Sequence, residues 1–491
     1  MTSTRRNLLR AGGAIVGLIA ALCLTHAAVV QLSALHPPEI RKSPDELHVV
    51  SPTLKAYGKS YVRESDGVIE ARLEGDGAQI GWASGRLLRR EILETESRLF
   101  RQFETYVPRA WARLLLLDWA RIRYSHLDKN LDANTREELA NLGASLAPDP
   151  FASFMPVYQR LVYLNGLYDI SLSFERAPLV GCTTFLVRSA PSEIGHNWLA
   201  RNFDFEVDEI FDQKKVIYLM IEPGAIPFAS VAWPGLPGVV SGMNAEGLAL
   251  VVHGGRAGSF DVSGEPLLQT MRYVMGHAHS SNEAVALLRQ KKPMVSHLVI
   301  MTDESGQSQV IERIPRQSPY VYRLPDRAVV TNHFIGPAAD DPRNLRVRDE
   351  TSTLYRQQRG QQILARLKRS VSASDLVGLL RERRGINDED LPLGDRRAIG
   401  ALIAAHGVVF DTTARKMWVS APPHLLGHFV EFDLKDLLEL APEPKATAEQ
   451  RPSLPADPLF VSGKYDEWNR AGRERLPLQT KPGANTGQTE R

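Results

Sequence analysis

The spacing of apolar and polar positions divides this chain into a mainly helical first part and a strand-rich second part. The run LLRREILETESRLFRQF, which begins at Leu87, repeats apolar residues at near-helical intervals with charges between them. This pattern predicts an amphipathic helix. Two further stretches of helical pattern, ARLLLLDWARIRY and TREELANLGASL, follow it. Residues 36–70 are instead punctuated by Pro and Ser, and we expect them to be mostly irregular.

The pattern changes at Gly181. Short β-rich runs, separated by Gly, Pro, Asn and Asp, extend from there to about residue 420. Helical runs interrupt them, among them SSNEAVALLRQ, in which Ser280 stands three residues before Glu283, a capping-box spacing. Strands, then helices, then more strands predict an α+β layered domain rather than an alternating βαβ fold.

The N-terminus reads as a targeting segment. TRRNLLR precedes an uncharged, largely apolar stretch over residues 11–38, which resembles a bacterial twin-arginine export signal. Thr25-His26-Ala27 is a loose match to a cleavage site, but the stretch is also long enough to cross a hydrocarbon core of about 20 residues. We therefore expect residues 1–35 to be an export signal or a membrane anchor, with the protein in the periplasm or on the outer face of the inner membrane.

Composition and motifs argue against several classes of partner. The 491 residues include 59 basic and 57 acidic ones, and no basic stripe interleaves with aromatics, so we expect no nucleic-acid partner. HExxH, CxxC and the phosphate-loop motif are lacking, and the carboxylates between Asp204 and Asp212 do not follow the EF-hand spacing. We expect neither a metal nor a cofactor. From residue 441 the chain turns polar and Pro-rich, which predicts a disordered or loosely docked tail, 441–491.

The candidate chemistry centres on Cys182. The only other cysteine, Cys23, lies in the N-terminal segment, so no disulfide can form within the folded part. A single cysteine on an apolar strand is often a small buried hydrophobe. As a nucleophile it would need a base and an oxyanion stabiliser. The base would be a histidine or the α-amino group of Cys182 itself, freed by a cut after Gly181. The histidine candidates, each also explicable as a structural residue, are His253, His297 and His333.

The motifs GCTTF, NWLARNFDF, GMNAEGLALVVH and VVTNHF, with GAQIGWASGRLL upstream, occur in an order that resembles a known family. This is the isopenicillin N acyltransferase (acyl-CoA:6-aminopenicillanic acid acyltransferase) family of autoproteolytic N-terminal-nucleophile (Ntn) hydrolases. More distantly, the motifs are similar to the penicillin V acylase, bile salt hydrolase and acid ceramidase groups. The resemblance covers about residues 70–435.

The resemblance implies an α+β fold, an Ntn-hydrolase αββα sandwich over 182–440, preceded by a largely helical pro-segment over 36–181. The precursor would cut itself between Gly181 and Cys182, and the two fragments would stay associated.

The resemblance also implies roles for four residues. Cys182 is the nucleophile, Asp204 accepts a hydrogen bond from its free amino group, Arg201 supports the thiolate, and Asn332 lines the oxyanion hole. Structural roles stay open for three of them. Arg201 and Asp204, three apart on a strand, point to opposite faces unless a bulge intervenes, and Asn332 could cap a turn.

Two departures from the family pattern stand out. His253 and Gly254 occupy the place where the hydrolase branch has an asparagine, so either a backbone N–H supplies the second oxyanion donor or this pair contacts substrate. Near residues 343–356, where a serine–arginine motif is usual, only Ser352 and Arg356 match loosely, and we assign them no role.

The expected activity is hydrolysis of a small-molecule N-acyl amide through a thioester. An exported enzyme meets no acyl-CoA pool, so we favour hydrolysis over acyl-CoA-dependent N-acyl transfer. The residues are also compatible with a non-enzymatic exported binding protein on this fold, and with a Cys–His hydrolase that uses His253 or His333 without self-cleavage.

Overall fold

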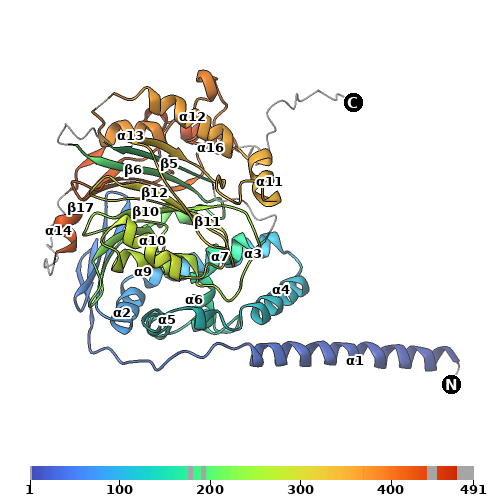
Figure 1. Cartoon of the computed structure of the whole chain (residues 1–491). Coiled ribbons are helices and arrows are strands. Elements are labelled where there is room, and N and C mark those ends of the chain that lie inside the picture. The colour runs from blue at the N-terminus through green and yellow to red at the C-terminus, as the bar shows by residue number, and fades with distance from the viewer. Residues whose placement is uncertain (1–2, 175–180, 189–194, 369, 440–449, 473–491) are drawn as a thin grey trace, which may run out of the picture.

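Two stacked sheets with helices on both outer sides make up the body of the protein (Figure 1). The computed structural model describes residues 3–174, 181–188, 195–368, 370–439 and 450–472. The predicted fold class, α+β with a two-sheet sandwich between helical layers, is confirmed.

The larger sheet has eleven strands in the order β1-β2-β3-β4-β7-β8-β9-β10-β11-β12-β13. Its strands are β1 (Leu47–Ser51), β2 (Leu54–Tyr57), β3 (Ser60–Ser65), β4 (Val68–Glu74), β7 (Val216–Ile221), β8 (Phe228–Ala232), β9 (Ser241–Asn244), β10 (Ala249–Gly254), β11 (His297–Thr302), β12 (Ser308–Arg313) and β13 (Tyr320–Arg323). All neighbours are antiparallel except β4 and β7, which pair in parallel from Ile69 with Val216 to Glu74 with Ile221. This pairing joins the segment before Cys182 to the segment after it.

The smaller sheet has seven strands in the order β14-β5-β6-β15-β16-β17-β18. Its strands are β5 (Gly181–Arg188), β6 (Asn197–Asp204), β14 (Arg327–Val330), β15 (Ala404–Asp411), β16 (Lys416–Ser420), β17 (Phe429–Asp433) and β18 (Ser453–Leu454). Strand β5 pairs with β6 so that Gly181 faces Asp204 and Thr184 faces Arg201. The predicted nucleophile therefore lies at the start of an interior strand.

The helices before Cys182 are α1 (Ser3–Leu32), α2 (Gly77–Leu87), α3 (Arg89–Tyr106), α4 (Ala110–Arg123), η1 (Leu127–Asn130), α5 (Ala133–Ser145), α6 (Val157–Asn165) and α7 (Leu167–Leu172). The later ones are α8 (Ile210–Gln213), α9 (Leu267–His277), α10 (Ser281–Gln290), α11 (Pro342–Glu350), α12 (Thr353–Ala365), α13 (Ala373–Leu380), η2 (Ile386–Asp388), α14 (Leu434–Leu438), α15 (Pro458–Val461) and α16 (Lys464–Arg470). The helical patterns of the sequence are confirmed as α3, α4 and α5, and Ser280 caps α10 by accepting from the Glu283 nitrogen.

Residues 36–70 were predicted to be mostly irregular, and this prediction is wrong for β1, β2 and β3 and for the start of β4. The strands are short, so their alternation is weak. The one strong local signal is Asp66-Gly67, whose positive φ angles of 54° and 74° form the tight turn between β3 and β4. The pro-segment is thus helical from α2 to α7 but begins as an extension of the sheet.

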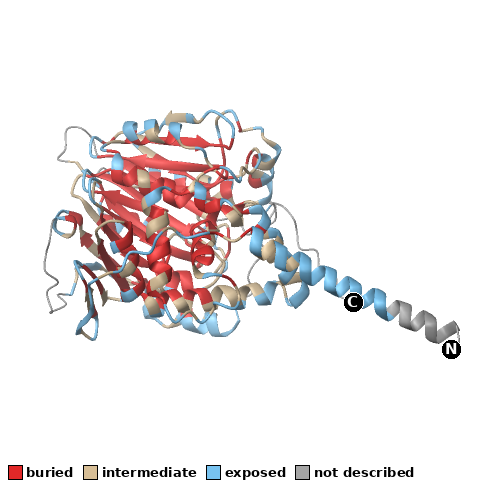
Figure 2. Cartoon of the chain, turned by 90° about the horizontal axis from the view of Figure 1, so that it is seen from below, coloured by how far each residue is buried: buried red, intermediate tan, exposed pale blue. Residues whose placement is uncertain are grey.

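Three clusters of buried apolar side chains pack between the layers. Leu199, Val251 and Val408 belong to the cluster between the sheets, and a second cluster lies between the smaller sheet and helices α12 and α13. The third covers the outer face of the larger sheet with α2, α5, α6, α9 and α10. Buried residues are accordingly found in both sheets and in the helices that cover them (Figure 2).

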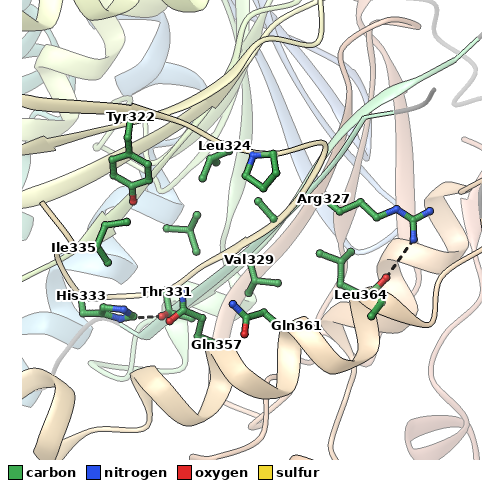
Figure 3. Close-up of a pocket in the computed structure, with 14 residues that line it drawn as sticks. Tyr322, Leu324, Arg327, Val329, Thr331, His333, Ile335, Gln357, Gln361 and Leu364 are labelled. Atoms are coloured by element: carbon green, nitrogen blue, oxygen red, sulfur yellow. Dashed lines mark hydrogen bonds between the residues drawn. The ribbon is translucent and has the colours of Figure 1, made fainter. Parts of the chain in front are cut away.

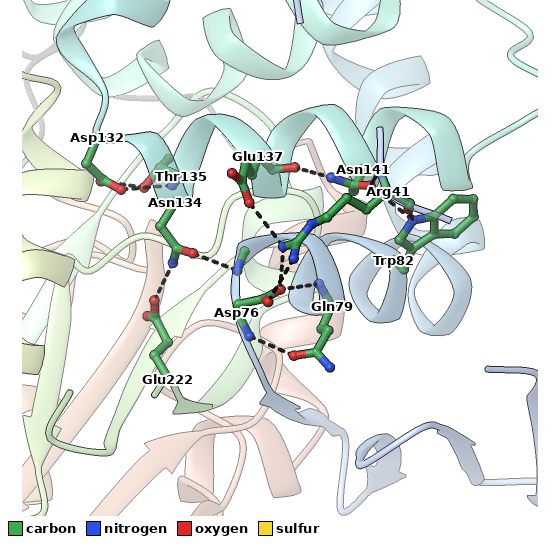
Figure 4. A network of polar contacts seen from close by, with 11 residues as sticks. Arg41, Asp76, Gln79, Trp82, Asp132, Asn134, Thr135, Glu137, Asn141 and Glu222 are labelled. Carbon is green, nitrogen blue, oxygen red and sulfur yellow. Dashed lines mark hydrogen bonds and ion pairs between the residues drawn. The ribbon is translucent and has the colours of Figure 1, made fainter. Parts of the chain in front are cut away.

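Helices α2 and α5 cross very closely because three glycines line the contact. A Cβ at Gly77 would lie 2.1 Å from the Asn134 carbonyl, and one at Gly81 would lie 2.3 Å from the Glu138 carbonyl. Figure 4 shows the polar network at this crossing. Asn134 accepts from the Gly77 nitrogen at 2.7 Å and donates to Glu222, at the end of β7, at 3.0 Å. The glycine-rich motif therefore serves packing between two helices that both precede Cys182, and Asn134 links this crossing to the residue that follows β7.

The described part of the tail is docked. Strand β18 pairs with β17, Tyr465 is buried, and Asp457 accepts hydrogen bonds from Arg383 at 2.9 and 3.1 Å. The prediction of a disordered or loosely docked tail is thus wrong for residues 450–472, and its remainder lies outside the described residues.

Candidate active site

Cys182 is the second residue of β5, and its side chain is fully buried between the two sheets. Its Sγ lies 3.4 Å from Nη2 of Arg201 and 3.9 Å from the carbonyl oxygen of Val252 on β10. Burial raises the pKa of the thiol, and the positive charge of Arg201 opposes this rise.

Arg201 is a fully buried cation in the middle of β6. Besides the thiol, its guanidinium donates to the Val252 carbonyl and to Ser241 Oγ, both at 2.6 Å. Its Cζ lies 4.3 Å from the centre of the Phe203 ring. These contacts hold the guanidinium in one orientation against the sulfur, and its support of a thiolate stays a prediction.

The peptide group of Cys182 is held as firmly as its sulfur. Its nitrogen donates to Oδ1 of Asn332 at 2.7 Å. Arg356, on α12, donates to the Cys182 carbonyl, to Thr183 Oγ1 at 2.7 Å and to Asn332 Oδ1 at 3.0 Å. Ser352 accepts from Arg356 Nε at 3.1 Å. The serine–arginine pair that the sequence left unassigned thus holds the backbone of Cys182, and the loose motif match was its only signal.

Asn332 is the second residue after strand β14 and is buried. Two donors point at its Oδ1, the Cys182 nitrogen and Arg356, and this fixes the orientation of the amide. Its Nδ2 donates to the Gly254 carbonyl at 3.0 Å. The side chain therefore bridges the ends of β5 and β10, where the two sheets meet.

Asp204 and Arg201 lie on opposite faces of β6. Arg201 faces the other sheet, whereas Asp204 shares a face with its cross-strand partner Gly181. A Cβ at Gly181 would lie 2.9 Å from Asp204 Oδ2, so only glycine fits there without a shift. Burial raises the pKa of Asp204 to about 6, and Oδ1 has no hydrogen-bond partner within the described ranges. The carboxyl group adjoins the Gly181–Cys182 junction from the side opposite Arg201.

All three candidate histidines make hydrogen bonds to groups other than the Cys182 thiol. His253 contacts Thr184 Oγ1 at 2.7 Å and the Thr331 carbonyl at 3.0 Å, and burial holds its pKa well below the ordinary value. His333 contacts Thr331 and Thr353, each at 3.2 Å.

His297 contacts the Val295 carbonyl at 2.8 Å. The structure shows His253 hydrogen-bonded to Thr184 and Thr331, and the Gly254 carbonyl accepting from Asn332. The predicted contact of His253 and Gly254 with substrate stays a prediction.

A cavity of about 440 Å³ lies beside β14, the edge strand of the smaller sheet, and adjoins the site (Figure 3). Thr331 and His333, which flank Asn332, line it, and Leu324, Val329 and Leu364 make its apolar wall. Since neighbouring side chains alternate along an extended segment, the Asn332 amide points away from this cavity. In the described part of the chain, no group of three or more His, Cys, Asp or Glu side chains is placed to hold a metal ion.

The comparisons with known proteins were made on sequence and on structure. None of the curated proteins matches the sequence. Among solved structures, an N-acylethanolamine-hydrolyzing acid amidase ortholog from Caenorhabditis elegans aligns at 15% identity and a TM-score of 0.35, over 47% of this chain and 93% of the other. A penicillin V acylase from Agrobacterium tumefaciens gives 15% and 0.35, over 52% and 88%. A mutant conjugated bile acid hydrolase from Clostridium perfringens gives 10% and 0.34, over 54% and 98%.

The chain also matches a family model within its strand-rich second part. The model of the acyl-coenzyme A:6-aminopenicillanic acid acyl-transferase family aligns with residues 192–391. That range begins after Cys182 and includes Arg201, Asp204, Asn332 and Arg356. Over residues 192–391, therefore, the chain matches the acyl-coenzyme A:6-aminopenicillanic acid acyl-transferase family, the family that its motifs predicted.

Proposed function

We propose that this protein is a cysteine Ntn hydrolase that cuts its own chain before Cys182 and then hydrolyses an N-acyl amide. One arrangement carries the proposal. The sulfur of Cys182 contacts Arg201 at 3.4 Å while its backbone nitrogen contacts Asn332 at 2.7 Å. Polar groups thus engage both atoms that this chemistry requires.

The cutting step uses only groups at this junction. Sγ of Cys182 attacks the carbonyl carbon of Gly181, the C–N bond between the two residues breaks, and the thiol proton ends on the departing nitrogen. Water then hydrolyses the thioester, which leaves a carboxyl group on Gly181 and a thiol beside a free α-amino group. Glycine at position 181 leaves the carbonyl unobstructed, and Asp204 adjoins the nitrogen that becomes the amine.

The same groups then serve turnover. The α-amino group, with an ordinary pKa of about 7.7–8.0, takes the thiol proton and later returns it to the leaving amine. Asp204 holds the resulting ammonium group, and Arg201 stabilises the thiolate. We assign oxyanion stabilisation to Nδ2 of Asn332, which donates to Gly254 in the uncut chain.

The fragments on either side of the cut would stay together. Strands β4 and β7 form six paired positions across it. Arg272, on α9, contacts Glu138, on α5, at 2.7 Å, and both side chains are buried. Neither contact depends on the bond between Gly181 and Cys182, so self-cleavage leaves the sandwich intact.

We favour hydrolysis over acyl-CoA-dependent transfer because the N-terminal segment directs the protein out of the cytoplasm, where acyl-CoA is found. Helix α1 contains a segment, Gly12–Leu32, that is long and apolar enough to cross a membrane. A periplasmic or anchored enzyme has water as its abundant acceptor.

The test is the intact mass of the purified protein together with sequencing of its new N-terminus. We expect two fragments, the second beginning Cys-Thr-Thr-Phe, and activity on an N-acyl amine. Cys182→Ala should give one uncut, inactive chain, whereas the control Cys23→Ala should be cut normally. Full activity in an uncut chain would contradict the proposal, and consumption of acyl-CoA without amide hydrolysis would favour the transferase.

A further inference from the structure

Helix α4 exposes an apolar stripe that the proposed chemistry does not use. Its exposed side chains include Trp111 at 62%, Leu115 at 55% and Ile122 at 60%. These positions, with Leu114 and Trp119, fall on one face of the helix. Among the described residues outside α1, no other helix or strand exposes as many large apolar side chains. Exposed apolar patches of this kind mark a surface that meets a partner.

The partner is indicated by what lies beside the stripe. The C-terminal end of α1 packs on α4, with His26 Nδ1 2.8 Å from the Asp118 carboxylate. Further along, Ser33 is buried and its carbonyl accepts from Gln159 on α6 at 3.2 Å. Figure 1 shows α1 leaving the body beside α4, and Figure 2 shows its described residues before His26 exposed.

The length of α1 then places α4 relative to a bilayer. An apolar span needs to cover a hydrocarbon core of about 30 Å. Gly12–Thr25, the part of the apolar segment that precedes the contact with α4, covers only about 21 Å at 1.5 Å per residue. Arg10 stops the span from starting earlier. The remaining ~9 Å must therefore come from the part of α1 that packs on α4, which brings α4 to the membrane surface.

We propose that α1 is retained as an anchor and that α4 lies in the interface of the same membrane, with its apolar stripe in the headgroup and acyl boundary. Two Trp side chains suit this depth, because their rings favour the membrane–water interface. Arg123, an exposed residue near the end of α4, suits it as well because a long side chain can reach the headgroups, while Asp118 is paired with His26 and Arg121. This proposal goes beyond the hydrolase chemistry and does not depend on it.

The first test measures quenching of tryptophan fluorescence in the full chain, reconstituted into phosphatidylcholine and phosphatidylglycerol vesicles whose acyl chains are brominated near the headgroup. We expect clear quenching in the natural protein and loss of most of it in Trp111→Phe/Trp119→Phe. The control Trp468→Phe, which alters α16, should be quenched like the natural protein. Equal quenching in all three, or none, would overturn the proposal, as would an N-terminal fragment whose mass lacks α1.

A second measurement does not depend on the tryptophans. In a Cys23→Ala/Cys182→Ala chain, a nitroxide on Leu115→Cys should relax more with oxygen than with a polar nickel complex when the protein is in vesicles. The matched label on Leu354→Cys, an exposed position of α12, should show the reverse. The same polar preference at both positions, or a label at position 115 that is shielded from both reagents by a second copy of the chain, would overturn the proposal.

Discussion

The backbone nitrogen of Cys182 donates a hydrogen bond of 2.7 Å to the side-chain oxygen of Asn332. This bond orients the peptide group that the proposed self-cleavage would break. In the proposed mature enzyme it would hold the same nitrogen as an amine, with Asp204 nearby. Since Arg356 also donates to this oxygen, Asn332 is already in place in the uncut chain.

Replacing Asn332 with Ala should impair both stability and chemistry. The change leaves the Cys182 N–H and one Arg356 donor without their acceptor in a buried site, which should cost about 1–3 kcal/mol of folding free energy. Loss of an oxyanion donor should lower kcat by about 10²–10³-fold. Thermal unfolding and kinetics measure the two effects. Asn282→Ala, at an exposed position, is the control, and an Asn332→Ala enzyme with normal kcat would remove Asn332 from the mechanism.

Replacing Gly181 with Ala should slow cutting but leave the cut enzyme unaffected. The added Cβ would lie 2.9 Å from Asp204 Oδ2, and a cost of about 1.4 kcal/mol at the transition state corresponds to tenfold slower cutting. After the cut, position 181 is the end of the other fragment. Gel analysis over time measures the cutting rate, and activity is then normalised to the cut fraction. Gly378→Ala, where a Cβ meets no neighbour within 4 Å, should cut at the normal rate.

Arg201 should control the acidity of the thiol. Because its charge opposes the rise that burial causes in the pKa of Cys182, Arg201→Met should move the pH profile of iodoacetamide alkylation to higher pH. Loss of a charge-assisted bond of about 1.5–3 kcal/mol should reduce turnover by roughly 10–100-fold. Arg201→Lys keeps the positive charge, so its alkylation profile and its turnover should lie between those of the natural protein and those of Arg201→Met. An unshifted alkylation profile in a folded Arg201→Met protein would show that Arg201 serves packing alone.

The sequence was sufficient to predict the sandwich, the strand that begins at Gly181 and the helices α3, α4 and α5, because each has a local pattern. The role of Arg356 had no such pattern. Its partner Cys182 is 174 positions away, and helical spacing does not tell which strand a helix covers. The family motif alone indicated it, and only loosely.

Two further features show where local patterns fail. Strands β1, β2 and β3 were missed since their stability comes from joining β4, and through it β7, rather than from their own alternation. Arg201 and Asp204 lie on opposite faces of β6, as the period of a strand requires. The site needs both faces because the thiol and the preceding residue Gly181 point to opposite sides of β5.

The buried pair of Arg272 and Glu138 should keep the two fragments together after cutting. Arg272→Met leaves the Glu138 carboxyl buried without its partner, which should cost about 3–5 kcal/mol. We expect native mass spectrometry to find the natural fragments bound to each other and the variant fragments separating at lower urea. Lys214→Met removes a more exposed pair across the cut, Lys214 with Glu94 at 3.8 Å, and should change little. Separation of the natural fragments without denaturant would contradict the prediction.

Asp204 should make the uncut protein less stable as the pH rises. Burial raises its pKa from 3.8 to about 6, so the folded chain binds a proton more tightly than the unfolded chain does. The stability from this group is complete below pH 3.8 and is lost as the pH rises through about 6, a difference of about 3 kcal/mol. An Asn at position 204 does not titrate, so it avoids the free-energy cost of burying a charged carboxylate.

The comparison is made between Cys182→Ala and Cys182→Ala/Asp204→Asn, so that neither chain is cut. We expect the double variant to be the more stable at pH 7.5 and the difference to shrink towards pH 4.5, as measured by denaturation at both values. Other buried carboxyls, such as Asp169, occur in both chains and cancel. A double variant that is less stable at pH 7.5 would mean that the Asp204 carboxylate is charged and stabilising before the cut. The amine freed by cleavage would then meet an existing anion.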